Sequence, residues 1–194
     1  MSKTSKFLSL ILRHSPETIN IQLDPNGWVN TDELITKMNE HGHSIDIHKL
    51  RIVVESNNKK RFTFNDDSTM IRANQGHSVE VNLELAPKTP PEFLYHGTAT
   101  KNMEDILDHG IKSMNRNHVH LTTDFDTAVT VAKRHGSDIT IIKVSALSMH
   151  TSGQSFYQSK NGVWLTEKVQ PNFMDLYNEE GTKIRFAVRY NEVS

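Results

Sequence analysis

The chain has 194 residues, a formal net charge of −1 and no cysteine, with 36% hydrophobic and 23% charged residues. This composition indicates a folded globular protein; it excludes disulfides, thiolate nucleophiles and cysteine-based zinc sites, and it offers no general basic excess for binding nucleic acid. No apolar run approaches the roughly 20 residues of a membrane-spanning helix, and no secretory cleavage pattern is present, so we expect a cytoplasmic protein without membrane contact.

The sequence up to residue 86 predicts three helices followed by a β-hairpin. Apolar residues recur at helical spacing over residues 5–13 and stop before a Ser-Pro pair, where a helix is expected to end. Thr31 and Asp46 are expected to cap the second and third helices, because short polar side chains accept hydrogen bonds from the free amides of a first turn. The strands expected here cover residues 28–29, 61–64 and 69–73. This order is typical of a winged helix, so we expect a winged-helix lobe over residues 1–86.

A proline-rich stretch separates this part from the rest of the chain. Three prolines fall within residues 87–91, where they can neither continue a helix nor lie in a central strand, so we expect an extended linker. Short strands and helices follow, which predicts a mixed α+β lobe over residues 92–194. The helices expected there cover residues 103–107 and 127–135, and the strands cover 93–98, 119–121, 139–144, 162–165 and 184–190.

Four side chains stand out as candidates for chemistry, and each has a plain structural alternative. Arg13 and His14 end the first helix, where the alternative is a cationic cap that complements the helix dipole. Arg61 follows two lysines, and such a run of cations commonly lies in a solvated hairpin. Arg116 precedes a strand and is, taken alone, an ordinary surface arginine. The individual residues therefore leave the chemistry open.

Longer motifs surround these residues and carry more information. They are SKFLSLILRH at 5–14, KRF at 60–62, IRANQGHS at 71–78, YHGT at 95–98, RNHVHL at 116–121 and SKNGVWLT at 159–166. In this order, the six strings closely resemble the motifs of the RNA 2'-phosphotransferases, the KptA family of tRNA-splicing enzymes. The string RANQGHS is especially specific, and the resemblance spans nearly the whole chain.

The resemblance implies an N-terminal winged-helix lobe that binds RNA and a C-terminal lobe of the ADP-ribosyltransferase fold that binds NAD. In the implied reaction, an internal 2'-phosphate of RNA attacks the nicotinamide ribose of NAD and expels nicotinamide. The ribose 2''-hydroxyl of this ADP-ribosylated intermediate then attacks the phosphorus, which releases RNA with a free 2'-hydroxyl and ADP-ribose 1'',2''-cyclic phosphate. NAD is consumed as a co-substrate, the partner is a tRNA-like RNA, and a monomer is the default expectation.

By the same resemblance, Arg13, His14, Arg61 and Arg116 form the catalytic tetrad. Phosphoryl transfer depends on positioning and on stabilising charge over the phosphate oxygens, which guanidinium forks match while staying protonated. We therefore assign the three arginines to the 2'-phosphate and expect no metal requirement. His14 donates to phosphate as imidazolium or moves a proton as imidazole, and our hypothesis is that it supports the second step near the ribose 2''-hydroxyl.

The tripeptide His96-Gly97-Thr98 resembles the NAD-holding element of the ADP-ribosyltransferase fold. We expect His96 to bond to the adenosine ribose and Gly97 to let the backbone approach the nicotinamide amide. The alternative for such a tripeptide is a simple β-turn.

Two histidines alternate along the strand expected at residues 119–121. Because side chains alternate across a strand, His118 and His120 face opposite sides, and we favour His120 as the NAD-facing residue, with Thr122 or Thr123 nearby. A zinc site at this pair is disfavoured, since no further ligands occur at suitable spacing.

Further polar residues are candidates for contact with the RNA. Gln75 and His77 lie in the segment between the hairpin and the linker. They either face the cleft between the two lobes or serve as a structural connector. Lys6 and Ser9 lie on the same predicted helix as Arg13, where they touch RNA phosphates or belong to a solvated helix face.

Two rival functions remain open at this point. The first is an ADP-ribosyltransferase of the same fold that stops after the first step and modifies phosphorylated RNA or DNA ends. The second is a non-catalytic winged-helix module that binds DNA. The third predicted helix is a poor reader of the major groove, because its few cations are offset by Asp46 and Glu55, and this module leaves the second lobe unexplained.

Overall fold

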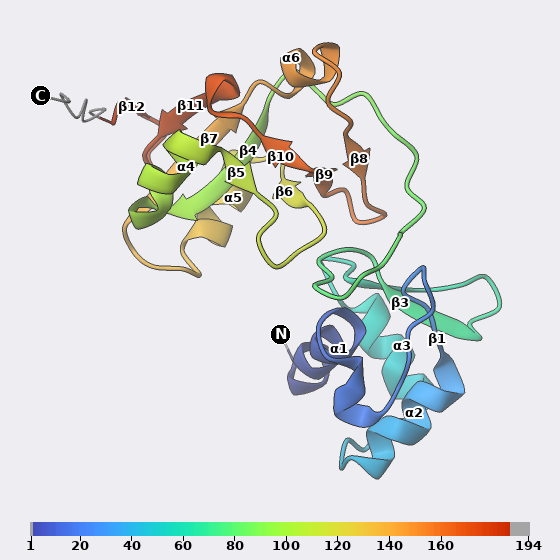
Figure 1. Cartoon of the computed structure of the whole chain (residues 1–194). Helices are drawn as coiled ribbons and strands as arrows, with labels where there is room; N and C mark the ends of the chain where they lie inside the picture. Colours follow the sequence, from blue (N-terminus) through green and yellow to red (C-terminus); the bar gives the residue numbers. More distant parts are fainter. Residues whose placement is uncertain (1, 187–194) are drawn as a thin grey trace, which may run out of the picture.

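The computed structural model describes residues 2–186 and confirms the α+β class. Figure 1 shows two bodies joined by an extended segment. We call residues 2–73 the N-terminal body, residues 74–93 the connecting segment and residues 94–186 the C-terminal body. In the described chain the connecting segment contains no helix or strand, and none of the described helices combines the length and apolar character needed to span a membrane.

The N-terminal body packs three helices against a small sheet. Its helices are α1 (Lys3–Arg13), the 3-10 helix η1 (Pro16–Ile19), α2 (Thr31–Glu40) and α3 (Ile47–Glu55). Its strands β1 (Val29–Asn30), β2 (Phe62–Phe64) and β3 (Met70–Ala73) pair antiparallel in the order β1-β3-β2. The helices bury one apolar face each, and the largest fully buried side chains of this core are Leu8, Ile11, Leu12, Ile19, Leu34, Met38, Leu50 and Ile71.

Polar side chains cap the first turns of α2 and α3, and one of the two capping residues differs from the prediction. Asp46 caps α3 as expected, accepting from the Lys49 amide at 2.8 Å. The cap of α2 is Asn30 and not Thr31, because the Asn30 side chain accepts from the Glu33 amide at 3.0 Å. Thr31 is the first helical residue, and its hydroxyl instead donates to the Ser68 carbonyl.

The C-terminal body contains several short antiparallel strands and helices. Its helices are η2 (Thr100–Asn102), α4 (Met103–His109), α5 (Phe125–Ala132), α6 (Ala146–Thr151) and η3 (Pro171–Phe173). Its strands are β4 (Leu94–Ala99), β5 (Ile111–Lys112), β6 (Val119–Leu121), β7 (Ile139–Val144), β8 (Tyr157–Gln158), β9 (Trp164–Thr166), β10 (Lys168–Val169), β11 (Met174–Tyr177) and β12 (Lys183–Ile184). They form sheets in the orders β12-β11-β7-β4, β6-β9-β8 and β10-β5 within the described residues.

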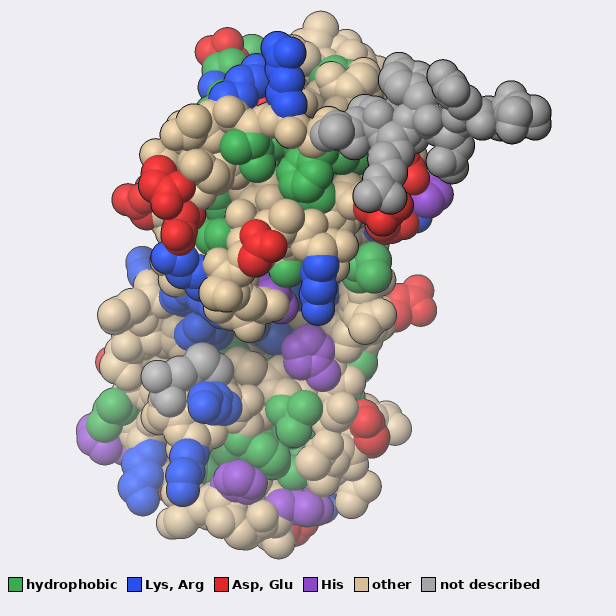
Figure 2. Space-filling view, turned by 90° about the vertical axis from the view of Figure 1, so that its left-hand side faces the viewer, with side chains coloured by type: hydrophobic (Ala, Val, Ile, Leu, Met, Phe, Trp, Pro, Cys, Tyr) green, Lys and Arg blue, Asp and Glu red, His purple; other side chains and the backbone are tan. Residues whose placement is uncertain are grey.

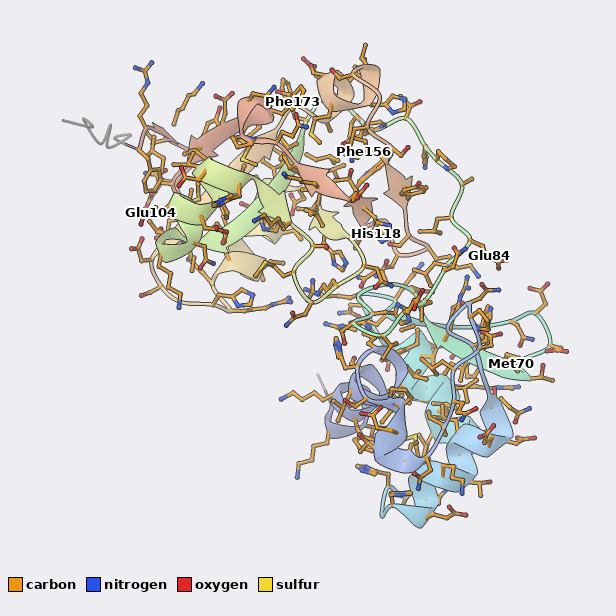
Figure 3. The ribbon with its side chains drawn as sticks, viewed as in Figure 1. Met70, Glu84, Glu104, His118, Phe156 and Phe173 are labelled. Atoms are coloured by element: carbon orange, nitrogen blue, oxygen red, sulfur yellow. The ribbon has the colours of Figure 1, made fainter. Side chains whose placement is uncertain are left out.

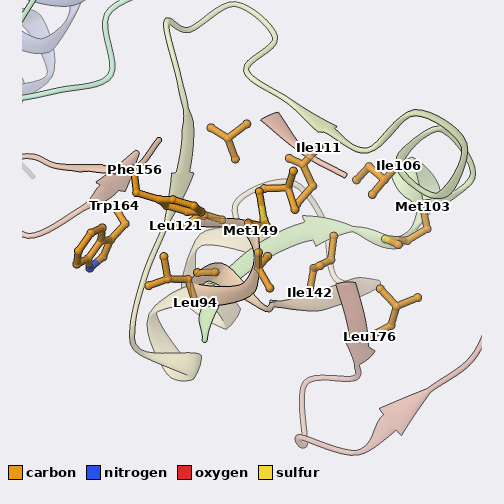
Figure 4. Packing of buried hydrophobic residues seen from close by; sticks show 14 residues of the cluster. Leu94, Met103, Ile106, Ile111, Leu121, Ile142, Met149, Phe156, Trp164 and Leu176 are labelled. Atoms are coloured by element: carbon orange, nitrogen blue, oxygen red, sulfur yellow. The ribbon is translucent and has the colours of Figure 1, made fainter. Parts of the chain in front are cut away.

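One face of β4 lies against the main core of this body. Figure 4 shows apolar side chains from β4, β7, α4 and β9 meeting there, among them Leu94, Ile142, Met103 and Trp164. Tyr95 exchanges backbone hydrogen bonds with Thr122 at 2.7 and 3.0 Å, which fixes the end of β6 beside β4. The strands that carry the predicted site residues are therefore held in register.

The opposite face of β4 is covered by α5 at unusually close range. A Cβ added to Gly97 would lie 2.0 Å from the Ala128 carbonyl oxygen and 3.0 Å from Ala132 Cβ. This glycine therefore allows the helix to approach the strand, a different reason from the approach to nicotinamide that the sequence suggested. The contact fixes α5 relative to His96 on the other face of the strand.

Gly97→Ala is expected to destabilise the protein by at least about 3 kcal/mol, because backbone atoms must move to relieve the clash. The free energy of unfolding from urea titration measures this effect. Gly42→Ala serves as a control, since its added Cβ meets no atom within 4 Å and only the left-handed backbone at φ +81 is strained. An unchanged free energy of unfolding in Gly97→Ala would contradict the packing of α5 on β4.

Most predicted elements are present, with shifted ends and several omissions. The helix predicted over residues 127–135 is Phe125–Ala132, capped by Asp124, and the strand predicted over 162–165 is Trp164–Thr166. Of the strand predicted over 184–190, the structure contains Lys183–Ile184, and residues 187–190 lie outside the described residues. The sequence did not predict α6, β5, β8, β10 and β11.

Candidate active site between the two bodies

Arg13 lies at the end of α1, where the connecting segment crosses the helix. Its carbonyl accepts hydrogen bonds from the Ser78 amide at 2.8 Å and the Val79 amide at 3.3 Å. The guanidinium lies 5.9 Å from the centre of the Phe62 ring, and its Nε and Nη2 atoms are buried without a hydrogen-bond partner in the described structure. Buried donors without partners are costly, so this guanidinium is poised for an external acceptor.

Arg61 directly precedes β2 and is half-buried. Its Nη1 donates to Asn57 Oδ1 at 3.0 Å, and its carbonyl accepts from the Asn74 amide at 2.8 Å. The side chain is thus anchored by a neutral amide, and one end of the guanidinium stays available.

Arg116 lies in the loop before β6, in the C-terminal body. Its Nη1 donates to His120 Nδ1 at 3.1 Å. An arginine can only donate, so Nδ1 must accept and the neutral His120 ring carries its proton on Nε2. Burial, followed by the charges of Arg116 and Arg13, lowers the pKa of His120 to about 3, which keeps the ring neutral.

The three arginines come together from distant parts of the sequence. Burial, followed by the charges of Arg61 and Arg116, lowers the pKa of Arg13 to about 10, so the other two positive charges both act on Arg13. None of the ion pairs found among residues 2–186 includes any of the three. Figure 2 shows Lys, Arg and His side chains gathered in the recess between the two bodies. The recess is a concentrated positive site without carboxylate compensation in the described part of the chain.

One further cation, Arg134, belongs to this site and was not singled out in the sequence. The charge of Arg134, which follows α5, contributes to lowering the pKa values of Lys59, Arg61 and Arg116, after burial in each case. Arg134 follows Lys133 at the end of a helix, where cations are common, so no sequence signal distinguished it. The fold alone brings it to the arginines.

Hydrogen bonds join the C-terminal body to the connecting segment and to the N-terminal body. Asn117 donates from Nδ2 to the Val81 carbonyl at 3.1 Å, and Asn161 donates to the Lys59 carbonyl at 3.0 Å. In Figure 3, Glu84 marks the connecting segment, Met70 the N-terminal body and His118 the C-terminal body. The Asn161 contact is important because its partner, Lys59, lies in the short segment that carries Arg61 into β2.

His14 lies next to Arg13 and is exposed. Its Nδ1 lies 2.9 Å from Ser78 Oγ, and the same Ser78 binds the Arg13 carbonyl through its amide. Burial, then the charges of Arg13 and Arg116, lowers the pKa of His14 below its ordinary value of 6.5. The free protein therefore carries a neutral His14 at neutral pH, with Nε2 free of hydrogen bonds in the described structure.

The residues predicted to hold NAD fall into two groups. His96 Nδ1 donates to the His120 carbonyl at 3.0 Å, so the Nε2 of a neutral ring is an acceptor. Thr98 is buried and its hydroxyl accepts from Asn102 at 3.1 Å, which favours a structural role for this side chain. The ring of His96 is the part of the tripeptide that stays available for a ligand.

The two threonines after β6 differ in their surroundings. Thr122 Oγ1 accepts from the Asp124 amide at 3.1 Å, at the turn that leads into α5. Thr123 is exposed. The ring of His120 lies near Arg13 and Gly76, since a Cβ added at Gly76 would be 3.6 Å from both side chains. His120 thus faces the arginines.

The residues predicted to contact RNA are placed differently from one another. Lys6 is exposed on α1, while Ser9 donates its hydroxyl to the Ser5 carbonyl at 3.0 Å. Gln75 is half-buried in the connecting segment. His77 is only 2% exposed and its Nε2 lies 3.3 Å from the Cβ position of Gly27, which favours packing rather than substrate contact.

His77 makes stability depend on pH. Burial and the charges of Arg13, His14 and Arg72 lower its pKa to about 4, from 6.5 for an unperturbed ring. Because the unfolded chain takes the proton first, the folded state loses stability as pH falls from 7 toward 4. Between pH 7 and pH 5 we expect the parent protein to lose about 2 kcal/mol more than His77→Phe, measured by urea unfolding. Equal losses would contradict a buried neutral His77.

Comparison with known proteins gives one consistent match. The family described as RNA 2'-phosphotransferase, Tpt1 / KptA family, matches residues 1–168. A probable RNA 2'-phosphotransferase of Fusobacterium nucleatum is 52% identical over 172 residues, covering 89% of this chain and 96% of the relative. Proteins of the same description from Flavobacterium johnsoniae and Nostoc punctiforme are 51% and 49% identical, covering 88% and 89% of this chain and 93% and 94% of the relatives.

Proposed function

The chain belongs to the RNA 2'-phosphotransferase, Tpt1 / KptA family, and from this premise we propose that it removes an internal 2'-phosphate from RNA and passes it to NAD. The products are RNA with a free 2'-hydroxyl, nicotinamide and ADP-ribose 1'',2''-cyclic phosphate. One observation carries the proposal: the charges of Arg61 and Arg116 both act on Arg13, and none of the ion pairs found among residues 2–186 includes any of these arginines.

The arginines fit a terminal phosphate better than they fit the other acceptors in RNA. A 2'-phosphate carries up to two negative charges on three oxygens, and guanidinium forks bind such oxygens in pairs. Because Arg13 keeps two buried donors without partners, a bound phosphate recovers hydrogen bonds that the free protein lacks. The same contacts stabilise the charge that shifts among the phosphate oxygens during transfer.

The side of the recess formed by β4 and β6 fits NAD. His96 would offer its unpaired ring nitrogen as an acceptor for a ribose hydroxyl, and His120 would offer its Nε2 hydrogen, because its Nδ1 is occupied by Arg116. When bound, NAD would supply the anomeric carbon that bonds to the 2'-phosphate and the ribose 2''-hydroxyl that then attacks the phosphorus and displaces the 2'-oxygen of the RNA. His14, with Nδ1 at Ser78, leaves Nε2 free and would accept the proton of that hydroxyl.

We further propose that the two bodies correspond to a winged-helix lobe for RNA and an ADP-ribosyltransferase-fold lobe for NAD. Three helices and a sheet ordered β1-β3-β2 support the first assignment, since a winged helix has this element order. The strand β4 with His96, backed by α5, supports the second.

Incubation with NAD and a short oligonucleotide bearing one internal 2'-phosphate tests the proposal. Mass spectrometry of both products is expected to show RNA lighter by one phosphate group and ADP-ribose 1'',2''-cyclic phosphate, and neither forms without NAD. A stable ADP-ribosyl adduct without release of the cyclic phosphate would indicate the rival activity, an ADP-ribosyltransferase of phosphorylated ends. Unchanged RNA in the presence of NAD would contradict both functions.

A further inference from the structure

Asn57 is a buried polar residue just after α3 that no motif singled out. It is 8% exposed, and its side-chain oxygen accepts from Arg61 Nη1 at 3.0 Å and from the Lys59 amide at 3.2 Å. Its amide nitrogen donates to Ser5 Oγ at 3.2 Å. All hydrogen bonds that the structure shows for this side chain are made with α1 or with the short segment that leads into β2.

These contacts connect the two parts of the N-terminal body that carry the arginines. Ser5 lies on α1, the helix that ends at Arg13 and leads into His14. Arg61 directly precedes the strand β2. A single buried amide therefore fixes the guanidinium of Arg61 relative to the helix that presents Arg13. A displacement of about 1 Å in such a constellation is enough to lower a rate about 100-fold.

The chemical type of this acceptor is as important as its position. Arginines in proteins are commonly oriented by carboxylates, which cancel their charge and compete with an incoming anion. The Asn57 amide orients the guanidinium without adding negative charge, just as the neutral ring of His120 does for Arg116. Both arginines are thus preorganised while the field of the recess stays positive.

We propose that Asn57 is a positioning residue that presents Arg61 to the phosphate of the substrate while leaving its charge uncompensated. The identity of that phosphate rests on the proposed function; the orientation of Arg61 by Asn57 does not. If Asn57 has this role, loss of its acceptor oxygen and addition of a negative charge at position 57 impair the enzyme in different ways. A merely structural role for the buried amide does not predict such a difference.

Three variants separate orientation from charge. Asn57→Leu removes the acceptor, Asn57→Asp keeps an oxygen acceptor but adds a negative charge, and Ser5→Ala removes only the other partner of the amide. We expect kcat/KM for 2'-phosphorylated RNA to fall about 10- to 100-fold in Asn57→Leu and in Asn57→Asp, with KM for NAD unchanged. In Asn57→Asp the loss is expected mainly as a raised KM for RNA. Ser5→Ala keeps the contact between Asn57 and Arg61, so we expect it to lower kcat/KM less than Asn57→Leu does.

A double-substitution test excludes a general loss of folding as the cause. In an Arg61→Ala background, Asn57→Leu is expected to cause no further loss of kcat/KM, because the residue it positions is already absent. Independent, additive losses in the double variant, or parental activity in both Asn57→Leu and Asn57→Asp, would overturn the proposal.

A nuclear magnetic resonance measurement tests the orientation without relying on activity. Rotation of the Arg61 guanidinium, followed through its side-chain nitrogen signals, is expected to be slow in the parent protein, in Asn57→Asp and in Ser5→Ala, and fast in Asn57→Leu. Equally slow rotation in Asn57→Leu would overturn the proposal. If the parent protein and the three variants show this pattern but the parent converts no 2'-phosphorylated RNA, the proposed function fails while the positioning role of Asn57 stands.

Discussion

Arg61→Ala is expected to lower the turnover of 2'-phosphorylated RNA by about 100- to 1000-fold while the protein stays folded. In the proposed reaction, this substitution removes one guanidinium that stabilises charge on the transferring phosphate. The fold is expected to persist, because Arg61 is half-buried and Asn57 Oδ1 still accepts from the Lys59 amide. Rapid-quench measurement of phosphate removal, together with thermal unfolding, gives both results.

Arg51→Ala is the matched control for this experiment. Arg51 is an exposed arginine on α3, and no hydrogen bond or ion pair of its side chain is found among the described residues. We expect parental turnover in this variant. Parental turnover in Arg61→Ala would instead remove Arg61 from the phosphate site.

His14→Ala is expected to change which species accumulates rather than to stop the reaction at the outset. In the proposed reaction, the arginines assigned to the 2'-phosphate remain in place and the attack on NAD would proceed, whereas the proton of the ribose 2''-hydroxyl would lose its acceptor. We expect ADP-ribosylated RNA to accumulate, with the second step slowed by about 100- to 10,000-fold. Rapid quench followed by gel separation of the adduct measures both steps.

His48→Ala, at an exposed position on α3, is the control and is expected to behave like the parent protein. A slow first step in His14→Ala, without adduct, would move His14 to the cleavage of the nicotinamide bond. The lowered pKa of His14 adds a pH signature, since the neutral ring needed as acceptor predominates in the free protein at neutral pH.

Local patterns in the sequence predicted the elements that local rules control. The periodicity of α1, the cap of α3 by Asp46 and the apolar strand β7 all follow from neighbours along the chain. The residues of the candidate tetrad were reached through resemblance, because single arginines have common structural roles. The structure adds that the charges of Arg61 and Arg116 both act on Arg13.

Features that depend on contacts between distant segments were not predictable. Asn30 rather than Thr31 caps α2, because the Thr31 hydroxyl finds a partner 37 residues away at Ser68. Arg134 joins the recess only through the packing of α5 on Gly97, and Asn57 meets Ser5 across 52 residues. The short strands of the C-terminal body are stabilised by their partners and have little pattern of their own.

The most direct test of the phosphate site is a crystal structure with a 2'-phosphorylated dinucleotide bound in the absence of NAD. We predict that Arg13, Arg61 and Arg116 all donate hydrogen bonds to the oxygens of the 2'-phosphate, at about 2.7–2.9 Å, and that the two unpartnered donors of Arg13 are among them. A phosphate bound outside the recess, or contacted by only one of the three guanidiniums, would contradict this account.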